Sequence, residues 1–211
     1  MSGLFITLEG VDGAGKSSHM QWLPDFFAQQ GLEVVMTREP GGTPVGEKLR
    51  EILLHESMSQ ETEALLMFAS RQENLNRVIK PALAAGKLLL CDRFTDSTYA
   101  YQGGGRHFDT GKIAALENWV QAGLNPDLTL LFDVPLAVSR ERLGRHGASL
   151  DRFEQENDTF FEAVRNAYLQ RAANDPARFM VVDSTQPFDQ VKEFVEAGLL
   201  KFIRQRINAH T

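Results

Sequence analysis

The residues with the clearest chemistry lie near the N-terminus, where one run matches the pattern G-x-x-x-x-G-K-[ST]. The run consists of Gly10, Val11, Asp12, Gly13, Ala14, Gly15, Lys16 and Ser17, with Ser18 directly after it. An apolar run precedes it and a helical pattern follows, which favours a nucleotide-phosphate site over an ordinary glycine-rich turn. Backbone N–H groups would surround phosphate oxygens, Lys16 would add a positive charge, and the Ser17 hydroxyl would be a ligand for Mg²⁺. The pattern therefore predicts a nucleoside triphosphate site.

Charged residues also follow the next two apolar runs of the chain. Arg38 and Glu39 come after the second run, and Asp92 and Arg93 come at the end of the third. Because ligands bind at the carboxyl ends of the strands in an open α/β sheet, we expect Arg38 and Arg93 beside the phosphate loop, where they could hold a second anion. Asp92 ends an apolar segment of the kind that positions Mg²⁺ directly or through water. The alternative is a surface ion pair between sequence neighbours.

A long helical segment carries an aromatic ring and an arginine on its apolar face. The stripe formed by Leu75, Ile79 and Leu83 continues backwards through Phe68 and Arg71. A charge on an inward face needs a partner, and a ring beside a guanidinium suits stacking on a base and hydrogen bonding to its edge. The alternative is a core phenylalanine beside an arginine that reaches solvent.

Two further segments differ from the rest of the chain. Three consecutive glycines, Gly103 to Gly105, predict a helix end or a loop with close backbone approach rather than a helix interior. The segment Arg140–Arg152 contains four arginines and two glycines, and it predicts an exposed, mobile excursion. Enzymes of phosphoryl transfer often close a lid that brings in an arginine, so we expect one there. The candidates are Arg142, Arg145 and Arg152, and the alternative is a solvated basic segment.

Five short apolar runs and the stretches between them indicate the fold. The runs are Leu4–Glu9, Glu33–Arg38, Lys87–Asp92, Asp127–Asp133 and Phe179–Asp183, and their continuous apolar cores predict parallel strands buried on both faces. Helical patterns cover Lys16–Gln30, Val45–Leu54 (after Thr43 and Pro44), Ser59 to about Ala85, Asp109–Ala122, Pro135–Arg145, Asp158–Ala173 and Pro187–Ile207. The alternation predicts an α/β fold: a doubly wound five-stranded parallel sheet flanked by helices.

Composition restricts the class of protein. The chain has 211 residues and a formal net charge of −6, with 43% hydrophobic residues, which fits one globular domain and argues against a nucleic-acid-binding surface. No apolar stretch approaches the about 18 residues that a membrane span requires, and no signal peptide is evident. Cys91 is the only cysteine, so no disulfide can form within the chain. These features predict a cytoplasmic protein that binds neither nucleic acid nor membrane.

Four motifs besides the phosphate loop resemble those of bacterial thymidylate kinases, which belong to the P-loop nucleoside monophosphate kinases. They are TREPGGT (Thr37–Thr43), DRF (Asp92–Phe94), AYQGGGR (Ala100–Arg106) and LDRFEQE (Leu150–Glu156), and the resemblance extends to VVDS (Val181–Ser184). It implies transfer of the γ-phosphoryl group of ATP to dTMP, Mg²⁺ dependence and a homodimer. It also implies a P-loop NTPase-type three-layer sandwich, with residues 1–211 as one kinase domain and a mobile lid over about residues 140–152.

The resemblance also assigns roles to single residues. The phosphate loop and Ser18 would bind ATP, and Ser17 and Asp92 would hold the metal. The implied dTMP contacts are Asp12 with the sugar, Arg38 and Arg93 with the phosphate, Phe68 and Arg71 with the base, Thr98 and Gln102 in the base pocket, and Tyr101 near the sugar 2′ position. Position 13 is glycine, whereas one branch of the family has arginine there. The catalytic arginine is therefore expected on the lid.

Two other classes of protein share the phosphate loop. A kinase for another monophosphate or a nucleoside is the nearer alternative. A GTP-regulated switch would carry an N-K-x-D segment after a strand, whereas Asn125-Pro126-Asp127 lacks the lysine and precedes its strand. A motor-type ATPase would usually place a glutamate after the strand-end aspartate, where this chain has Arg93.

Overall fold

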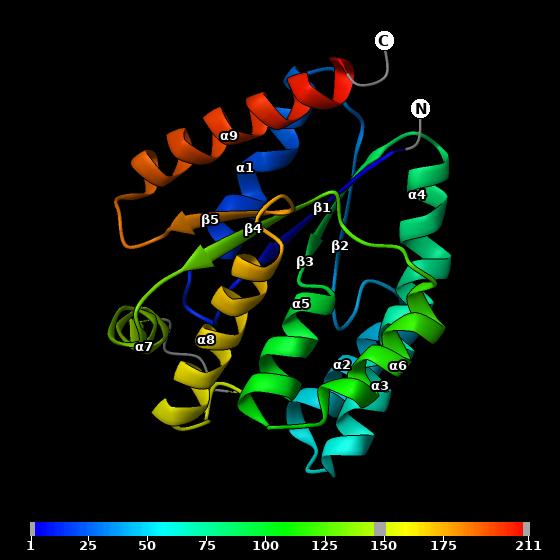
Figure 1. The fold of residues 1–211 in the computed structure, drawn as a ribbon, viewed down its shortest axis with the longest axis vertical. Coiled ribbons are helices and arrows are strands. Elements are labelled where there is room, and N and C mark those ends of the chain that lie inside the picture. Colours follow the sequence, from blue (N-terminus) through cyan, green and yellow to red (C-terminus); the bar gives the residue numbers. More distant parts are fainter. Residues whose placement is uncertain (1–2, 146–150, 209–211) are drawn as a thin grey trace.

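A computed structural model describes residues 3–145 and 151–208, without the side chains of residues 145, 207 and 208 (Figure 1). Five strands form one parallel sheet in the order β2-β3-β1-β4-β5, which confirms the predicted fold. They are β1 (Leu4–Glu9), β2 (Val34–Arg38), β3 (Leu88–Asp92), β4 (Leu128–Asp133) and β5 (Phe179–Asp183). In the described part of the chain, no helix is long and apolar enough to cross a membrane.

The helices lie between the strands as predicted, with three differences. They are α1 (Lys16–Gln29), α2 (Pro44–His55), α3 (Gln60–Asn74), η1 (Leu75–Ile79), α4 (Lys80–Ala84), α5 (Thr95–Thr98), η2 (Tyr99–Gly105), α6 (Thr110–Gln121), α7 (Leu136–Arg145), α8 (Asp158–Asn174) and α9 (Phe188–Asn208). The predicted long helix is α3 and α4 with a π-helical turn, η1, between them, and α5 and η2 were not predicted. Thr43 and Ser59 accept backbone N–H bonds at the starts of α2 and α3, as N-caps do.

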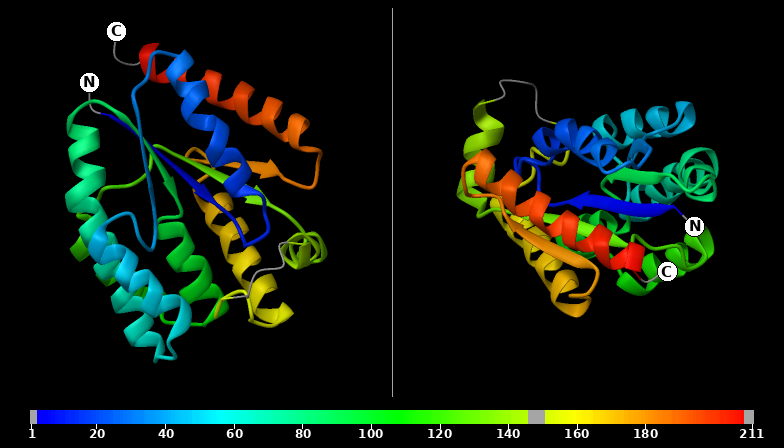
Figure 2. Two further views of the ribbon diagram at one scale, coloured as in Figure 1. Left: turned by 180° about the vertical axis from the view of Figure 1, so that it is seen from behind. Right: turned by 90° about the horizontal axis from the view of Figure 1, so that it is seen from above.

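Helices cover both faces of the sheet. Alternate residues of β1 point to opposite sides, so Ile6 packs with α1 and α9, and Phe5 packs with α3, α4 and α6. Helix α8 lies in front of the sheet in Figure 1, and α1 comes to the front when the molecule is seen from behind (Figure 2). This arrangement buries the central strands β1, β3 and β4 on both sides, which explains their continuous apolar sequences, whereas the edge strands β2 and β5 are partly exposed.

The sheet brings the charged strand ends together. Asp92 at the end of β3 is in register with Leu8 of β1 on one side and with Arg38 of β2 on the other. The phosphate loop starts one residue after β1, at Gly10, and the strand order reverses across β1. The loop therefore begins at the switch point of the sheet, where ligands bind in this class of fold.

The three glycines are the last three residues of η2, which confirms the predicted helix end. The close backbone approach expected there is present, because η2 packs against α8. A Cβ atom on Gly104 would lie 2.6 Å from the Cβ of Ala167, and one on Gly105 would lie 2.4 Å from Phe160. These glycines are needed for helix packing, and that contact outweighs their low helix propensity.

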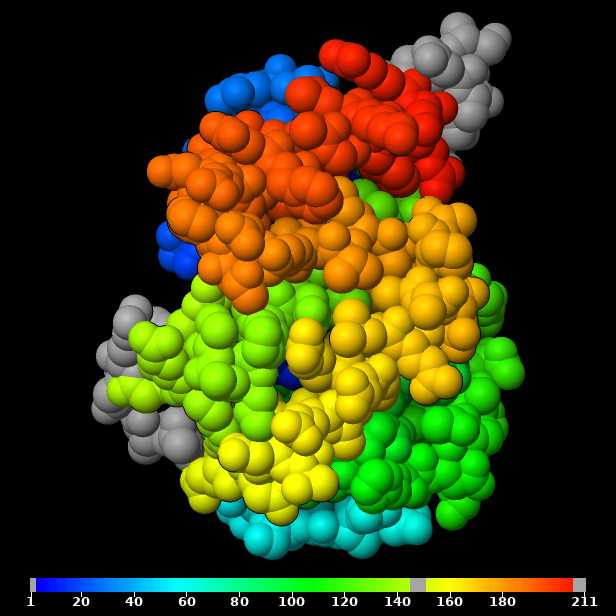
Figure 3. Space-filling model, turned by 60° about the vertical axis from the view of Figure 1, so that its left-hand side comes forward, coloured from blue at the N-terminus to red at the C-terminus, as the bar shows by residue number. Residues whose placement is uncertain are grey.

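The basic segment Arg140–Arg152 is only partly the excursion that was predicted. Its first residues, up to Arg145, form the second half of α7, and Arg152 is half-buried. Figure 3 shows α7 (yellow-green) and α8 (yellow) side by side, with dark blue atoms of the N-terminal part of the chain visible between them. Residues 146–150, which belong to the predicted lid, lie outside the described residues.

Candidate active site

The phosphate loop has a backbone that requires glycine at several positions. Gly10, Gly13 and Gly15 have positive φ angles of 138°, 77° and 92°. A Cβ atom would also lie 2.3 Å from a carbonyl oxygen at Gly10 and 2.6 Å from one at Gly13. The tight loop leads into α1 at Lys16, so its backbone N–H groups gather at the helix N-terminus.

Lys16 is buried against the loop. Its Nζ donates to the carbonyl oxygens of Gly10 at 2.9 Å and Val11 at 3.0 Å. Burial and the nearby Arg93 lower the pKa of Lys16 to about 8, against the attraction of Asp12, Asp92 and Glu9. The ammonium group is held at the centre of the loop, where an anionic ligand would favour its charged form.

Arg93 and Asp12 form an ion pair beside the loop. Arg93 Nη2 donates to Asp12 Oδ1, and Nη1 donates to the Gly10 carbonyl oxygen at 2.9 Å. The Tyr101 hydroxyl donates to Asp12 Oδ2 at 2.8 Å. Burial raises the pKa of Asp12, but Arg93 and Lys16 outweigh it, so the net pKa lies below its ordinary value and Asp12 is a carboxylate.

A cavity of about 590 Å³, partly open to solvent, lies next to this ion pair. Its lining includes most of the residues that the sequence analysis placed in the monophosphate site, namely Asp12, Arg71, Arg93, Thr98, Tyr101 and Gln102. The lining therefore combines residues of four helical segments, α2, α3, α5 and η2, with the phosphate loop and the residues that follow β2 and β3.

Arg71 is buried, so the alternative of an arginine that extends from the helix into solvent is wrong. Its Nε donates to Glu39 Oε2 at 2.7 Å and its Nη2 to the Thr98 hydroxyl at 3.0 Å, while Nη1 is buried without a partner among the described residues. The guanidinium carbon lies 4.7 Å from the ring centroid of Phe68 and 4.9 Å from that of Phe94. Arg71 is thus a fixed lining residue of the cavity with one NH₂ group, Nη1, that has no partner among the described residues.

Comparison with known proteins shows the family of the chain. The family profile described as Thymidylate kinase matches residues 8–195. The chain belongs to the thymidylate kinase family. It is 55% identical to the thymidylate kinase of Bordetella pertussis over 203 residues, covering 96% of this chain and 97% of the relative. It is 56% identical to that of Pseudomonas entomophila over 202 residues (94% and 96%) and 53% identical to that of Pseudomonas savastanoi over 209 residues (98% and 99%).

Two residues expected at the monophosphate site do not line the cavity. Arg38 is half-exposed and pairs with Glu47, with Nη2 and Oε2 2.6 Å apart, rather than with its neighbour Glu39. Phe68 is buried, and its ring packs against the Arg71 guanidinium. Of the two arginines expected to hold the phosphate, Arg93 lines the cavity and Arg38 does not, and Arg50 is a further arginine in the lining.

Arg142 and Arg152, two of the three arginines expected on a lid, make contacts in different parts of the structure. Arg142 Nη2 donates to the Ser184 carbonyl oxygen at 2.7 Å, and its Nη1 lies 3.4 Å from the Gly13 carbonyl oxygen. Arg152 is bound away from the loop, because it donates to the Leu53 carbonyl oxygen at 2.9 Å and pairs with Glu63 at 2.6 Å. Arg145 ends α7, and its side chain lies outside the described ones.

The predicted metal residues fit a cation that also takes oxygens from a bound nucleotide. Asp92 Oδ1 is buried and has no hydrogen-bond partner among the described residues, and Ser17 is exposed in the first turn of α1. The described residues contain no cluster of three or more His, Cys, Asp or Glu side chains that could hold a metal alone. Sparse protein ligation of this kind is typical of Mg²⁺ bound with phosphates.

Several residues around the cavity were not found from the sequence. Glu39 pairs with Arg71, Glu63 accepts from Gln102 at 2.8 Å, and Glu9 contacts the hydroxyls beside Arg93. Each of these glutamates is nearly fully buried. The sequence could have indicated two of them, since Glu9 ends one apolar run and Glu39 follows another, and such runs predict buried strands.

Proposed function

We propose that this protein is an ATP-dependent nucleoside monophosphate kinase that transfers the γ-phosphoryl group of ATP to dTMP, giving dTDP and ADP. The observation that carries the proposal is the cavity beside the phosphate loop, with Arg93 at its loop end and the unused N–H group of Arg71 in its wall. The two ends are suited to the phosphate and the base of one nucleotide. Relatives over nearly the whole chain are named thymidylate kinase, which supports the same acceptor.

In this mechanism the protein brings two polyanions together and stabilises the charge between them. The phosphate loop with Ser18 and Lys16 holds ATP, and Arg93 holds the dTMP phosphate. Asp12 and Tyr101 are placed to contact the sugar, and Arg71, Thr98 and Gln102 to contact the base. The acceptor oxygen of dTMP is already anionic at neutral pH, so no general base is required. Orientation of the two substrates supplies up to about 7–11 kcal/mol of the reduction in barrier.

We propose that Mg²⁺ is the cofactor and that Ser17 and Asp92 hold it, Asp92 directly or through water. The unpartnered Oδ1 of Asp92 supports this assignment. When bound, the ion neutralises charge on the transferring phosphoryl group.

The base specificity is tested by measuring ADP release with dTMP, dUMP, dCMP, dGMP and AMP. We expect dTMP to have the highest kcat/KM, because the Arg71 guanidinium and the Gln102 amide, which is held by donation to Glu63, define one pattern of donors and acceptors among the lining residues. Higher turnover of AMP or dCMP than of dTMP would contradict the proposed acceptor. Tight GTP binding without transfer to any monophosphate would favour a regulatory GTPase.

We propose that about residues 140–152 form a lid that supplies the catalytic arginine, and a comparison of Arg142→Ala, Arg145→Ala and Arg152→Ala by kcat tests it. We expect at least one variant to lose about 10³-fold in kcat, as loss of an arginine that stabilises a transferring phosphoryl group does. Unchanged kcat in all of them would place the catalytic arginine elsewhere. The present contacts of Arg142 and Arg152 are with backbone carbonyl oxygens and Glu63, which movement of the lid would exchange for phosphate oxygens.

We also propose a cytoplasmic homodimer of single-domain subunits that does not bind nucleic acid or membrane. Trp119 on α6 and Leu65 on the neighbouring α3 are 79% and 54% exposed, and contact with a second subunit would cover such apolar side chains. The acidic net charge and the single cysteine support the remaining parts of this proposal.

A further inference from the structure

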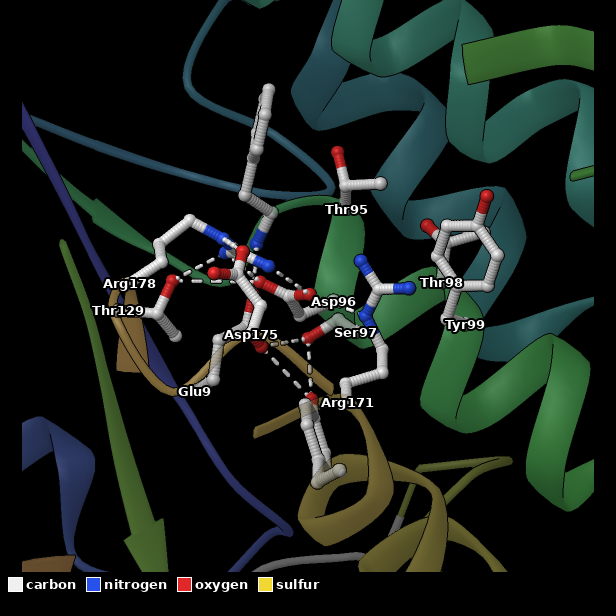
Figure 4. Close-up of polar contacts among 12 residues, drawn as sticks. Glu9, Thr95, Asp96, Ser97, Thr98, Tyr99, Thr129, Arg171, Asp175 and Arg178 are labelled. Carbon is white, nitrogen blue, oxygen red and sulfur yellow. Dashed lines mark hydrogen bonds and ion pairs between the residues drawn. The ribbon is translucent and has the colours of Figure 1, made fainter. Parts of the chain in front are cut away.

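Glu9, at the end of β1, is a fully buried carboxylate to which the proposed mechanism gives no role. Its Oε1 accepts from the backbone N–H of Phe94 at 2.7 Å. Its Oε2 accepts from the Ser97 hydroxyl at 2.6 Å and from the Tyr168 hydroxyl at 2.9 Å. Figure 4 shows Glu9 and Ser97 joined by such a contact. A buried side chain with three hydrogen bonds fixes the positions of the groups that donate to it.

The partners of Glu9 hold the side chain of Arg93. Arg93 Nη1 donates to the Tyr168 hydroxyl at 3.1 Å and to the Ser97 hydroxyl at 3.3 Å. Each hydroxyl has one proton. The Ser97 and Tyr168 hydroxyl oxygens lie 2.7 Å apart, and both contact the same oxygen of Glu9. Because Glu9 takes hydroxyl protons, oxygen lone pairs remain for Nη1 of Arg93.

Glu9 also holds the backbone of Arg93. Arg93 has a φ of 68°, a conformation that is unfavourable for a residue with a side chain. The backbone N–H of Arg93 donates to the Leu8 carbonyl oxygen at 3.0 Å, and the next N–H, of Phe94, donates to Glu9. The two acceptors, the Leu8 carbonyl oxygen and the Glu9 carboxylate, belong to consecutive residues of β1. Such a conformation persists where neighbouring contacts over-determine it.

We propose that Glu9 is a positioning residue for the monophosphate phosphate: it fixes Arg93 through the Phe94 N–H group and the hydroxyls of Ser97 and Tyr168. This inference rests on the proposed function, in which Arg93 holds that phosphate. Burial, and then repulsion from Asp96, raise the pKa of Glu9 to about 7, while Ser97 and Arg93 lower it. The carboxylate is therefore kept at an energetic cost that a purely structural glutamine would avoid.

The substitution Glu9→Gln tests the role because it preserves shape and removes one acceptor. A glutamine side chain has one acceptor oxygen, so in either amide orientation its NH₂ group faces a donor, Phe94 N–H or the hydroxyls. We expect the Kd for dTMP to rise about tenfold or more, since a hydrogen-bonded charged group is displaced. The Kd for thymidine, which lacks the phosphate, should stay within about twofold, and Tyr168→Phe should give a smaller rise of about threefold for dTMP.

The measurement is isothermal titration calorimetry on the full chain with dTMP and thymidine, with thermal unfolding of each variant. Asp96→Asn is the matched control, since it removes a buried carboxylate that binds Arg171 and Arg178 instead of the Arg93 group (Figure 4). We expect it to lower Tm and to leave the Kd for dTMP unchanged.

A folded Glu9→Gln variant that binds dTMP as wild type does, or that weakens dTMP and thymidine equally, would overturn the role of Glu9. If Glu9→Gln does not fold, the double variant Ser97→Ala/Tyr168→Phe decides in the same way, because it removes both hydroxyl links to Arg93. Should the substrate assay select another monophosphate, that nucleotide and its nucleoside replace dTMP and thymidine. The substrate assay therefore tests the proposed acceptor, and the Kd values of the variants test the role of Glu9 independently.

Discussion

Lys16→Ala is expected to lower kcat by about 10³-fold or more while the protein stays folded. The Lys16 ammonium group lies at the centre of the phosphate loop, bound to two loop carbonyl oxygens. In phosphoryl transfer a fixed cation stabilises the negative charge that spreads over the transferred group. The alanine side chain has no charge and cannot provide this stabilisation. The measurement is ADP release at saturating dTMP and ATP.

The fold should tolerate the change, because the lost contacts are two hydrogen bonds to backbone oxygens that water can replace. We expect a loss of about 1–3 kcal/mol in the free energy of unfolding, measured by urea denaturation. The exposed Lys201 on α9 provides the control, and Lys201→Ala should keep wild-type kcat. Activity of Lys16→Ala within a few-fold of wild type would contradict the role of this lysine.

The parts of the fold that the sequence predicted are those set by local pattern. Each strand is a short apolar run that ends in a charged residue, and burial on both faces accounts for that pattern. The π-helical stretch η2 depends instead on a distant helix, because Gly104 and Gly105 are selected by contact with Ala167 and Phe160. The local pattern predicts that a helix ends at the three glycines, as η2 does, but it cannot predict which distant helix packs against them.

The candidate site also has parts that local sequence pattern predicts and parts that depend on distant contacts. The phosphate loop is contiguous in sequence, and Arg71 was expected on an inward helix face because helical spacing places it there. Its partner Glu39 lies 32 positions away, and Tyr168 lies 75 positions from Arg93, so neither pairing follows from spacing. Arg38 was expected at the pocket from its strand end, yet Glu47, nine positions away on α2, holds it outside.

Arg71→Met is expected to lower the free energy of unfolding at pH 8 by about 3–5 kcal/mol, because it leaves a buried charge without its partner. Arg71 and Glu39 are 2% and 4% exposed, and Nε and Oε2 are 2.7 Å apart. The double variant Arg71→Met/Glu39→Gln should recover most of the loss, because a neutral amide in place of Glu39 can still accept from Asn74. Denaturant unfolding of both variants and of Glu39→Gln measures the coupling.

The loss from Arg71→Met should also depend on pH. Burial raises the pKa of Glu39 more than Arg71 and Asn74 lower it, and without Arg71 the pKa rises further. A carboxyl group whose folded-state pKa lies above its unfolded-state value binds protons more tightly in the folded protein. Its contribution therefore falls as pH rises between the two values. The variant should lie closer to wild type at pH 5 than at pH 8, and an equal loss at both would contradict an unpaired Glu39 charge.

The double variant also separates stability from recognition. It restores a neutral, packed interior but lacks the Arg71 Nη1 group, which is buried without a partner among the described residues. We expect its kcat/KM for dTMP to remain at least about tenfold below wild type, because the edge of the base then meets no donor from Arg71. Recovery of kcat/KM together with stability would show that Arg71 serves only to neutralise Glu39. Persistent loss in a stable protein would assign the base contact to Arg71.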